Sequence, residues 1–237
     1  MNDTVKRPSA QVGLDGAGGS LSAAERAYLA IHDMLVSLEI RPGAPINEDR
    51  LTRQLGIGRT PVLEALKRLE TERLVVIYPR RGSFATDIHI THLALISDLR
   101  LQLEPLPACR AAERATQADR ALCQRVLLDG LPALAGQDFR VLAQWDTGLH
   151  RLVYRCAGNS YLEATLTQYH SLASRIWYLF ADRLSGMAEH VVEDAEVLTA
   201  IVDRDPDRAA AVGHQNVRNF ERAILAVIEP ARDVRWP

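Results

Sequence analysis

The segment QWDTGLHRLVYRCAGNSYL contains an aspartate and a histidine whose spacing suits the binding of a ligand. Asp146 and His150 are four residues apart, so in a helix their side chains lie on one face. Leu142 and Val153 share that face, which predicts that both polar groups point into an apolar interior. A carboxylate beside an imidazole can ligate a divalent metal or hydrogen-bond a small molecule.

Two later segments, AEHVVEDAEVLTAI and AAAVGHQNVRNF, each place a polar residue on an apolar helix face. Asp194 lies on the face of Val191 and Leu198, and Asn216 lies on the face of Phe220. A buried polar group without a partner costs roughly 2–7 kcal/mol by transfer estimates, and a shared ligand or metal would remove that cost. An ordinary hydrogen-bonded core position is the simpler explanation for each residue alone, but the joint pattern favours a binding site.

These polar residues need a helical scaffold, and the sequence predicts one. Residues 91–228 have no strand pattern, and their apolar residues recur at helical spacing. About six helices are expected, separated by breaks near Thr116–Ala118, Gly136–Gln137, Gly158–Asn159, Ser185–Gly186 and Asp205–Pro206. The fold class is therefore expected to be mainly α, with an all-helical domain over residues 88–232.

The first part of the chain follows a different order. Residues 1–20 are polar and rich in glycine and serine, and we expect a disordered arm there. Helices are expected over 22–39 and 47–55 and from Thr60 onward, followed by a β-hairpin within 74–88. Three helices followed by a hairpin describe a winged helix-turn-helix, which we expect over residues 21–87.

Basic residues concentrate in this predicted winged helix. Between residues 50 and 81 there are eight basic and three acidic side chains, a local charge of +5 in a chain of net charge −2. Such a patch suits the phosphates of a DNA duplex, although a solvated charged face is the simpler alternative. The residues that we expect to contact DNA are Arg50, Arg59, Thr60, Lys67, Arg68, Arg80, Arg81 and Gly82.

Composition excludes several other classes of protein. The three cysteines are sparse and form no CxxC pair, which suits a reducing compartment. No apolar run approaches the roughly 18 residues that span a membrane, and the first residues lack the apolar core of a secretory signal. We therefore expect a cytoplasmic protein without a membrane partner. A metal-bundle enzyme is disfavoured because there is no Glu-x-x-His pair, phosphate loop, GxSxG or HExxH motif.

The segment INEDRLTRQLGIGRTPVLEALKRLETERLVVIYPRRGSFAT closely resembles the winged-helix domain of the GntR family of bacterial transcription regulators. RTPVLEAL and PRRGSF are its most specific pieces, and the resemblance extends over residues 22–87. It implies that Arg59, Thr60, Arg81 and Gly82 contact DNA.

Two residues depart from that family's usual pattern. Gly58 stands where a serine is usual, which removes a capping hydroxyl, and Leu63 stands where an arginine is usual. A leucine cannot contact a phosphate or a base edge as an arginine does. Either Lys67 and Arg68 compensate, or the operator differs from the usual one.

The helical part resembles the FCD-type effector domain of the FadR subfamily of GntR regulators. WDTGLHRLVYRCAGNSYL and LISDLRLQLEPLPACRAA carry the resemblance, which extends over about residues 90–228. Many members bind a divalent metal through one aspartate and three histidines, and hold a small carboxylate there. Asp146 and His150 match the first two ligands, but the third and fourth positions are Asp194 and Asn216 instead of histidines.

This departure predicts a metal site that is altered inside a retained effector pocket. A site with one histidine, two carboxylates and an amide is rich in oxygen, so it would favour Mg²⁺, Mn²⁺ or Ca²⁺, bind weakly, or hold no metal. His170 and His190 could also approach, but nothing in the sequence places them, and His214 is two residues away from the fourth position.

Arg100 is a further candidate for binding the effector. A guanidinium can form two parallel hydrogen bonds with a carboxylate ligand. Glu104 follows four residues later, so an ion pair within the helix is an equal alternative.

Together these features predict a ligand-responsive transcription regulator that acts as a homodimer on a double-stranded DNA operator. The expected effector is a small organic acid bound by Arg100, Asp146, His150, Asp194 and Asn216. The expected mode is that of a repressor released by its ligand, as is usual in the family. The alternative is a metabolite-binding module whose DNA reader has decayed, which Gly58 and Leu63 keep open.

Overall fold

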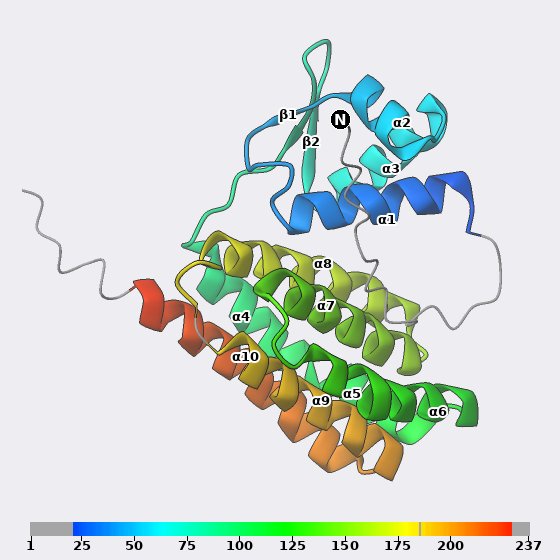
Figure 1. Ribbon diagram of the computed structural model, residues 1–237, viewed down its shortest axis with the longest axis vertical. Helices are drawn as coiled ribbons and strands as arrows, with labels where there is room; N and C mark the ends of the chain where they lie inside the picture. Colours follow the sequence, from blue (N-terminus) through cyan, green and yellow to red (C-terminus); the bar gives the residue numbers. More distant parts are fainter. Residues whose placement is uncertain (1–20, 185, 229–237) are drawn as a thin grey trace, which may run out of the picture.

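The computed structural model describes residues 21–184 and 186–228 (Figure 1). The expected arm over residues 1–20 and the end of the chain beyond Ile228 lie outside the described residues. The first part contains α1 (Ala23–Val36), β1 (Pro45–Ile46), α2 (Glu48–Leu55), α3 (Arg59–Thr71), β2 (Val75–Tyr78) and β3 (Gly82–Ala85). The second part contains α4 (His92–Leu103), α5 (Pro105–Arg114), α6 (Gln117–Arg125), a π turn (Val126–Gly130), a 3₁₀ turn (Pro132–Leu134), α7 (Phe139–Cys156), α8 (Ser160–Leu179), α9 (Met187–Asp203) and α10 (Pro206–Ile228).

Local sequence features explain the boundaries of the first helices. Ser22 and Asn47 cap α1 and α2, and each side chain accepts a hydrogen bond from the backbone three residues on. Gly56 ends α2 in the left-handed conformation, with a φ of 63°, which a glycine adopts at little cost. Helix α3 begins at Arg59, one residue before the predicted start.

The sheet has one strand more than the sequence predicted. β2 and β3 form the expected hairpin, and β1 pairs with the other edge of β3, so that the strand order is β1-β3-β2. With only two residues, β1 is too short to show an alternating pattern, and its pairing with β3 defines it.

The apolar faces of these helices form one cluster of the winged helix. Ile31 and Leu35 of α1 pack with Leu66 and Leu69 of α3, and all four side chains are fully buried. These residues recur three and four apart along each helix, which is the spacing of a single apolar face.

The helical part has seven α-helices among the residues described between His92 and Ile228, where about six were expected. The additional break separates α4 from α5 at Pro105, which has no backbone N–H to continue the helical hydrogen bonds. Four of the expected breaks fall between helices as predicted, and the fifth, at Ser185–Gly186, includes the undescribed Ser185.

Helices α7 and α8 lie between the winged helix and the rest of the bundle (Figure 1). α1 packs against α8, whereas α5, α9 and α10 pack against one another on the far side of α7. Among the described residues, no helix has both the length and the apolar character that a bilayer crossing requires.

Candidate functional site

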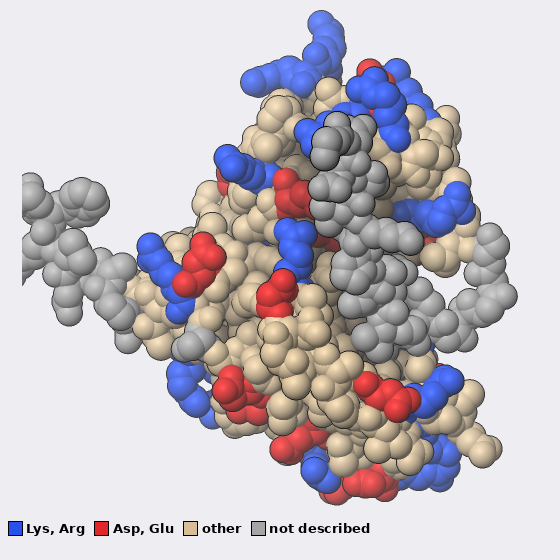
Figure 2. All heavy atoms as spheres, viewed as in Figure 1, with Lys and Arg blue, Asp and Glu red and all other residues tan. Residues whose placement is uncertain are grey.

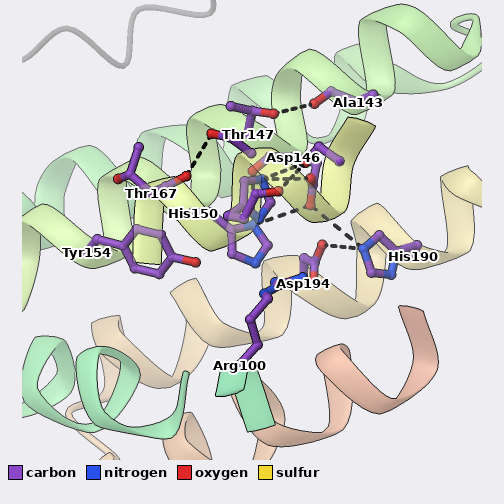
Figure 3. A network of polar contacts seen from close by, with 12 residues as sticks. Arg100, Ala143, Asp146, Thr147, His150, Tyr154, Thr167, His190 and Asp194 are labelled. Atoms are coloured by element: carbon purple, nitrogen blue, oxygen red, sulfur yellow. Dashed lines mark hydrogen bonds and ion pairs between the residues drawn. The ribbon is translucent and has the colours of Figure 1, made fainter. Parts of the chain in front are cut away.

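A small pocket lies in the helical bundle, and all five residues predicted to bind the effector line it. The side chains come from α4, α7, α8, α9 and α10, several of which Figure 3 shows together. The lining residues are Arg100, Asp146, His150, His170, Ser174, Trp177, His190, Asp194, Asn216 and Phe220. The inward faces predicted for the helices that carry Asp146, Asp194 and Asn216 therefore agree with the structure.

The carboxylate of Asp146 is surrounded by three imidazoles. Its Oδ1 lies 3.3 Å from Nδ1 of His150 and 3.7 Å from Nε2 of His190, and its Oδ2 lies 3.5 Å from Nε2 of His170. Because His150 and His170 also stack, with ring centroids 4.2 Å apart, the three histidines and the aspartate form one compact group.

His190 joins this group to the second carboxylate. Its Nε2 lies 3.0 Å from Oδ2 of Asp194, which is completely buried. The ligand atoms of Asp146, His190 and Asp194 lie within 4.8 Å of one another, a spacing that could hold one metal ion. Glu104, His150 and His170 form a second group with the same spacing.

The positions of His170 and His190 in this site were not predicted with the other ligands. His190 precedes Asp194 by four residues, so it shares the inward face of α9, and this spacing could have identified it. His170 lies on α8, where no neighbouring carboxylate marks the inward face. The expectation of a site with a single histidine is therefore wrong in its composition, because three imidazoles line the pocket. His214 does not line it.

Mutual charge and burial control the ionisation of these groups. Burial alone would lower the pKa of His150, but the charge and hydrogen bond of Asp146 outweigh burial and raise it to about 9. Burial raises the pKa of Asp194 to about 6. Burial and the charge of His150 hold the pKa of His170 well below its usual range. The charge of Asp194 outweighs burial and raises the pKa of His190. The pocket therefore combines two imidazoles whose pKa values are raised, one whose pKa is lowered, and two carboxylates.

Most of the buried side-chain atoms without a hydrogen-bond partner are in this pocket. Among the described residues there are seven such atoms, and five belong to the pocket: Oδ1 of Asp146, Nδ1 of His170, Nε1 of Trp177, and both carboxylate oxygens of Asp194. Oδ2 of Asp194 lies close to His190 but outside hydrogen-bonding geometry. Unpartnered acceptors suit a cation, and unpartnered donors suit an acidic ligand.

Arg100 lines the pocket and is also paired. Its Nη2 lies 2.8 Å from Oε1 of Glu104, and its Nε donates to the same oxygen at 2.9 Å. The hydroxyl of Tyr154 donates to this oxygen at 2.7 Å. The ion pair considered for Arg100 is present, and the guanidinium still faces the pocket.

The predicted DNA contacts of α3 lie at its exposed first turn. Arg59 and Thr60 are exposed, and Nη2 of Arg59 lies 3.4 Å from Oε2 of Glu48. Gly58 is the N-cap, and because glycine has no side chain it makes no capping hydrogen bond. Leu63 is half-buried one turn later.

The tip of the wing carries two exposed arginines. Arg80 adopts a φ of 61° and Gly82 a φ of 92°, so the tight turn depends on left-handed backbone that a glycine tolerates best. The guanidinium of Arg81 lies 5.6 Å from the centre of the Tyr78 ring. Figure 2 shows Lys and Arg gathered at the tip of this hairpin and over α2 and α3.

Arg68 makes contacts within the winged helix. Its guanidinium lies 3.5 Å from the centre of the Tyr28 ring and pairs with Glu25 at 3.0 Å and Glu72 at 3.4 Å. These contacts join α3 to α1 and leave the side chain half exposed, so a phosphate contact of Arg68 stays a prediction. Lys67 and Arg50 are exposed.

Comparisons with known proteins agree with this arrangement. Residues 23–84 match the family described as bacterial regulatory proteins, gntR family, and residues 95–219 match the FCD domain. The chain is 30% identical over 205 residues to the Nta operon transcriptional regulator of Aminobacter aminovorans, covering 84% of this chain and 92% of that protein. It is 22% identical to the HTH-type transcriptional repressor RspR of Escherichia coli K12, covering 88% of this chain and 92% of that protein. Among solved structures, E. coli McbR/YncC superimposes with a TM-score of 0.72 at 19% identity, covering 90% of this chain and all of that chain.

Proposed function

Because the chain belongs to the GntR family of bacterial regulators and carries their FCD domain, we propose that it is a repressor that a small organic acid releases from its operator. The chain is a DNA-binding transcription regulator, and relatives such as RspR are named as repressors. The observation that supports a ligand most directly is the pocket with five unpartnered polar atoms in the helical domain. No catalytic role is proposed, and the cytoplasm is the proposed location because the target is DNA.

We assign the proposed DNA contacts to two groups. Arg59 and Thr60 occupy the start of α3, which in helix-turn-helix proteins enters the major groove. The tip of the wing consists of Arg80, Arg81 and Gly82, and it can approach the DNA backbone or the minor groove. Arg50 and Lys67 are exposed beside them and are proposed as phosphate contacts. Arg68 is half exposed beside its contacts with α1 and is proposed as a further phosphate contact.

Operator binding is tested by fluorescence anisotropy on duplexes selected from a random pool with the full-length protein. Arg59→Ala is expected to lose about 1–3 kcal/mol and to relax the preference at one base position. Lys67→Ala is expected to weaken binding equally on all sequences and to reduce the salt dependence. Arg125→Ala, on the exposed surface of α6, is the control. Selection that yields no preferred sequence would support the alternative of a decayed DNA reader.

The pocket is proposed to hold a divalent metal. Asp146 and Asp194 supply unpartnered carboxylate oxygens, and His190 lies within 4.8 Å of both. The imidazole of His190 suits Zn²⁺ and the two carboxylates suit Mn²⁺, so both metals are candidates for this site. His150 is then proposed to orient Asp146, since its Nδ1 lies 3.1 Å from the backbone carbonyl oxygen of Asp146 and 3.3 Å from the carboxylate.

Metal binding is tested by calorimetry and elemental analysis of untagged protein. Wild type is expected to bind one equivalent, and Asp194→Asn is expected to lose affinity at least tenfold because one charged ligand is removed. Glu193→Gln changes the same charge on the exposed face of α9 and serves as the control. Wild-type protein that takes up neither Zn²⁺ nor Mn²⁺ would overturn this assignment.

The effector is proposed to bind on the donor side of the pocket. The indole Nε1 of Trp177 is a buried donor without a hydrogen-bond partner, and Arg100 and Asn216 line the same space. The cavity volume is about 10 Å³, which is room for about one water molecule, so the side chains that line the pocket must move apart to admit an organic acid.

A homodimer is proposed because helix-turn-helix proteins commonly read two half-sites. Leu95 and Leu99 on α4 and Leu106 on α5 are exposed large apolar side chains close together in sequence. We propose that a second copy covers this face. Light scattering is expected to report a dimer for wild type and a monomer for Leu95→Glu/Leu99→Glu, whereas Leu128→Glu, on another exposed leucine, should leave the dimer intact.

A further inference from the structure

Helices α7 and α8 contribute to two different surfaces at once. One face of each helix lines the pocket, and a neighbouring face contacts the winged helix. In three pairs of adjacent residues, the first lines the pocket and the second contacts the winged helix, because neighbouring side chains point in different directions from a helix. The adjacent pairs are His150 and Arg151, His170 and Ser171, and Ser174 and Arg175.

The first contact with the winged helix centres on His32 of α1, which is completely buried. Its Nδ1 accepts a hydrogen bond from Nη2 of Arg151 at 2.9 Å, because an arginine can only donate. Its Nε2 therefore carries the proton and donates to Oγ of Ser171 at 2.8 Å. Arg151 also lies 3.5 Å from Asp33, so a single imidazole is held by both α7 and α8.

The second contact lies where the chain leaves the wing. Nη1 of Arg175 donates to Oγ1 of Thr86 at 2.7 Å, and Nη2 donates to the backbone carbonyl oxygen of Thr86 at 2.6 Å. Thr86 follows β3 directly, and its hydroxyl donates to the carbonyl oxygen of Arg73 just before β2. Arg175 thus holds the base of the wing hairpin against α8.

Arg175 is a costly residue for a purely structural contact. Its side chain is 1% exposed, its Nε has no partner, and among the described residues no carboxylate lies within ion-pair distance of it. Burial lowers its pKa to about 10. A buried charge held only by neutral groups is expensive, and strongly perturbed ionisable groups cluster at functional sites.

We propose that Arg175 and His32 are positioning residues that transmit ligand binding in the pocket to the winged helix. A metal held by Asp146, His190 and Asp194 also moves His170, whose Nε2 lies 3.5 Å from Oδ2 of Asp146, and so displaces α7 and α8. This displacement changes the contacts of Arg175 with Thr86 and of Ser171 with His32. The orientation of the wing relative to the bundle changes as a result. This inference rests on the proposed function of the pocket as a binding site.

The experiment measures hydrogen exchange of the full-length protein without metal and with Zn²⁺ or Mn²⁺, with metal binding measured on the same samples. In wild type, metal is expected to change the exchange rates of amides in α1 and in residues 86–91 by about fivefold or more, a typical allosteric coupling. Arg175→Met and Thr86→Val are expected to abolish the response of residues 86–91, while metal affinity stays within about twofold. Arg175→Lys should restore part of it, and Arg125→Lys, on α6, should leave it unchanged.

Two results would overturn the inference while leaving the proposed site intact. One is stoichiometric metal binding without any change in the exchange of α1 and residues 86–91. The other is an equal change in the exchange of residues 86–91 in wild type, Arg175→Met and Thr86→Val. Absence of metal binding would count against the proposed metal site instead.

Coupling is then measured without metal, by filling the pocket with Ser174→Leu. This substitution is expected to alter the exchange of residues 86–91 when introduced alone, but not when combined with Thr86→Val. If its effect is the same in both backgrounds, the inference fails independently of the metal.

Discussion

At the scale of single residues, Arg100 combines two roles that the sequence left as alternatives. It forms a buried ion pair with Glu104, and it lines the pocket beside Asn216. Glu104 also accepts a hydrogen bond from Tyr154, so the carboxylate keeps one partner if the arginine is removed. The two roles can be separated by comparing stability with ligand response.

Arg100→Met is expected to destabilise the protein by about 3–5 kcal/mol, because it leaves the carboxylate of Glu104 buried without its countercharge. Urea denaturation monitored by circular dichroism measures this loss. The double variant Arg100→Met/Glu104→Met should recover much of the stability, and Arg114→Met, on the exposed surface of α5, should have little effect. A loss below about 1 kcal/mol would contradict the structural role of the pair.

At the scale of elements, the start of α3 lacks a side-chain cap. Gly58 has φ and ψ of −61° and 161°, which any residue can adopt. A Cβ placed there would meet only the Cδ of Pro61 at 3.8 Å, an ordinary contact. A serine would therefore fit in the geometry that lets its hydroxyl cap the helix.

Gly58→Ser is expected to stabilise the winged helix by a few tenths of a kcal/mol, and Gly58→Ala to destabilise it by roughly 1 kcal/mol. Thermal denaturation of the two variants and wild type measures both effects. Equal melting temperatures for the serine and alanine variants would show that capping is not what position 58 contributes.

The packing of α10 on α5 depends on a second glycine. A Cβ on Gly213 would lie 3.4 Å from Cβ of Ala108 and 3.4 Å from the carbonyl oxygen of Glu104. This distance is at the limit of ordinary contact, so one methyl group fits and a larger side chain does not.

Gly213→Ala is therefore expected to be close to neutral or to stabilise by up to about 1 kcal/mol, since alanine favours the helix over glycine. Gly213→Leu should destabilise by about 1–3 kcal/mol through overpacking. Chemical denaturation distinguishes them, and a leucine variant as stable as wild type would mean that the two helices can separate without cost.

At the scale of the whole molecule, His32 makes the contact between winged helix and bundle sensitive to pH. Burial lowers its pKa from the ordinary value of 6.5, against the opposing influence of Asp33 on the same helix. Arg151 from α7 disfavours its protonation, and Glu72 favours it. The docked histidine is therefore neutral.

Stability is expected to fall as the pH drops below about 6.5, because the exposed imidazole of the unfolded state then takes up a proton that the folded state does not bind. Above this pH both states are neutral at this position, and the effect disappears. Melting temperatures between pH 5 and 8 should fall less steeply in His32→Gln than in wild type. Parallel curves for the two proteins would argue against a neutral, buried His32.

Most of the helices, the hairpin and the inward faces of the helices could be predicted from the sequence alone. The order of three helices and a hairpin, the +5 patch, and the inward positions of Asp146, His150, Asp194 and Asn216 all follow from spacing and charge. Spacing suffices because each helix has a fixed period, so that residues three or four apart share a face regardless of what packs against it.

Which helix faces contact one another is visible only in the tertiary structure. It brought His170 and His190 to Asp146, placed Arg68 on Tyr28, added β1 to the sheet, and joined Arg175 to Thr86. Contacts between distant segments depend on the crossing and offset of whole helices, which packing of the entire core selects. For this reason the sequence located the pocket, whereas the imidazoles around Asp146 and the link to the winged helix became visible only in three dimensions.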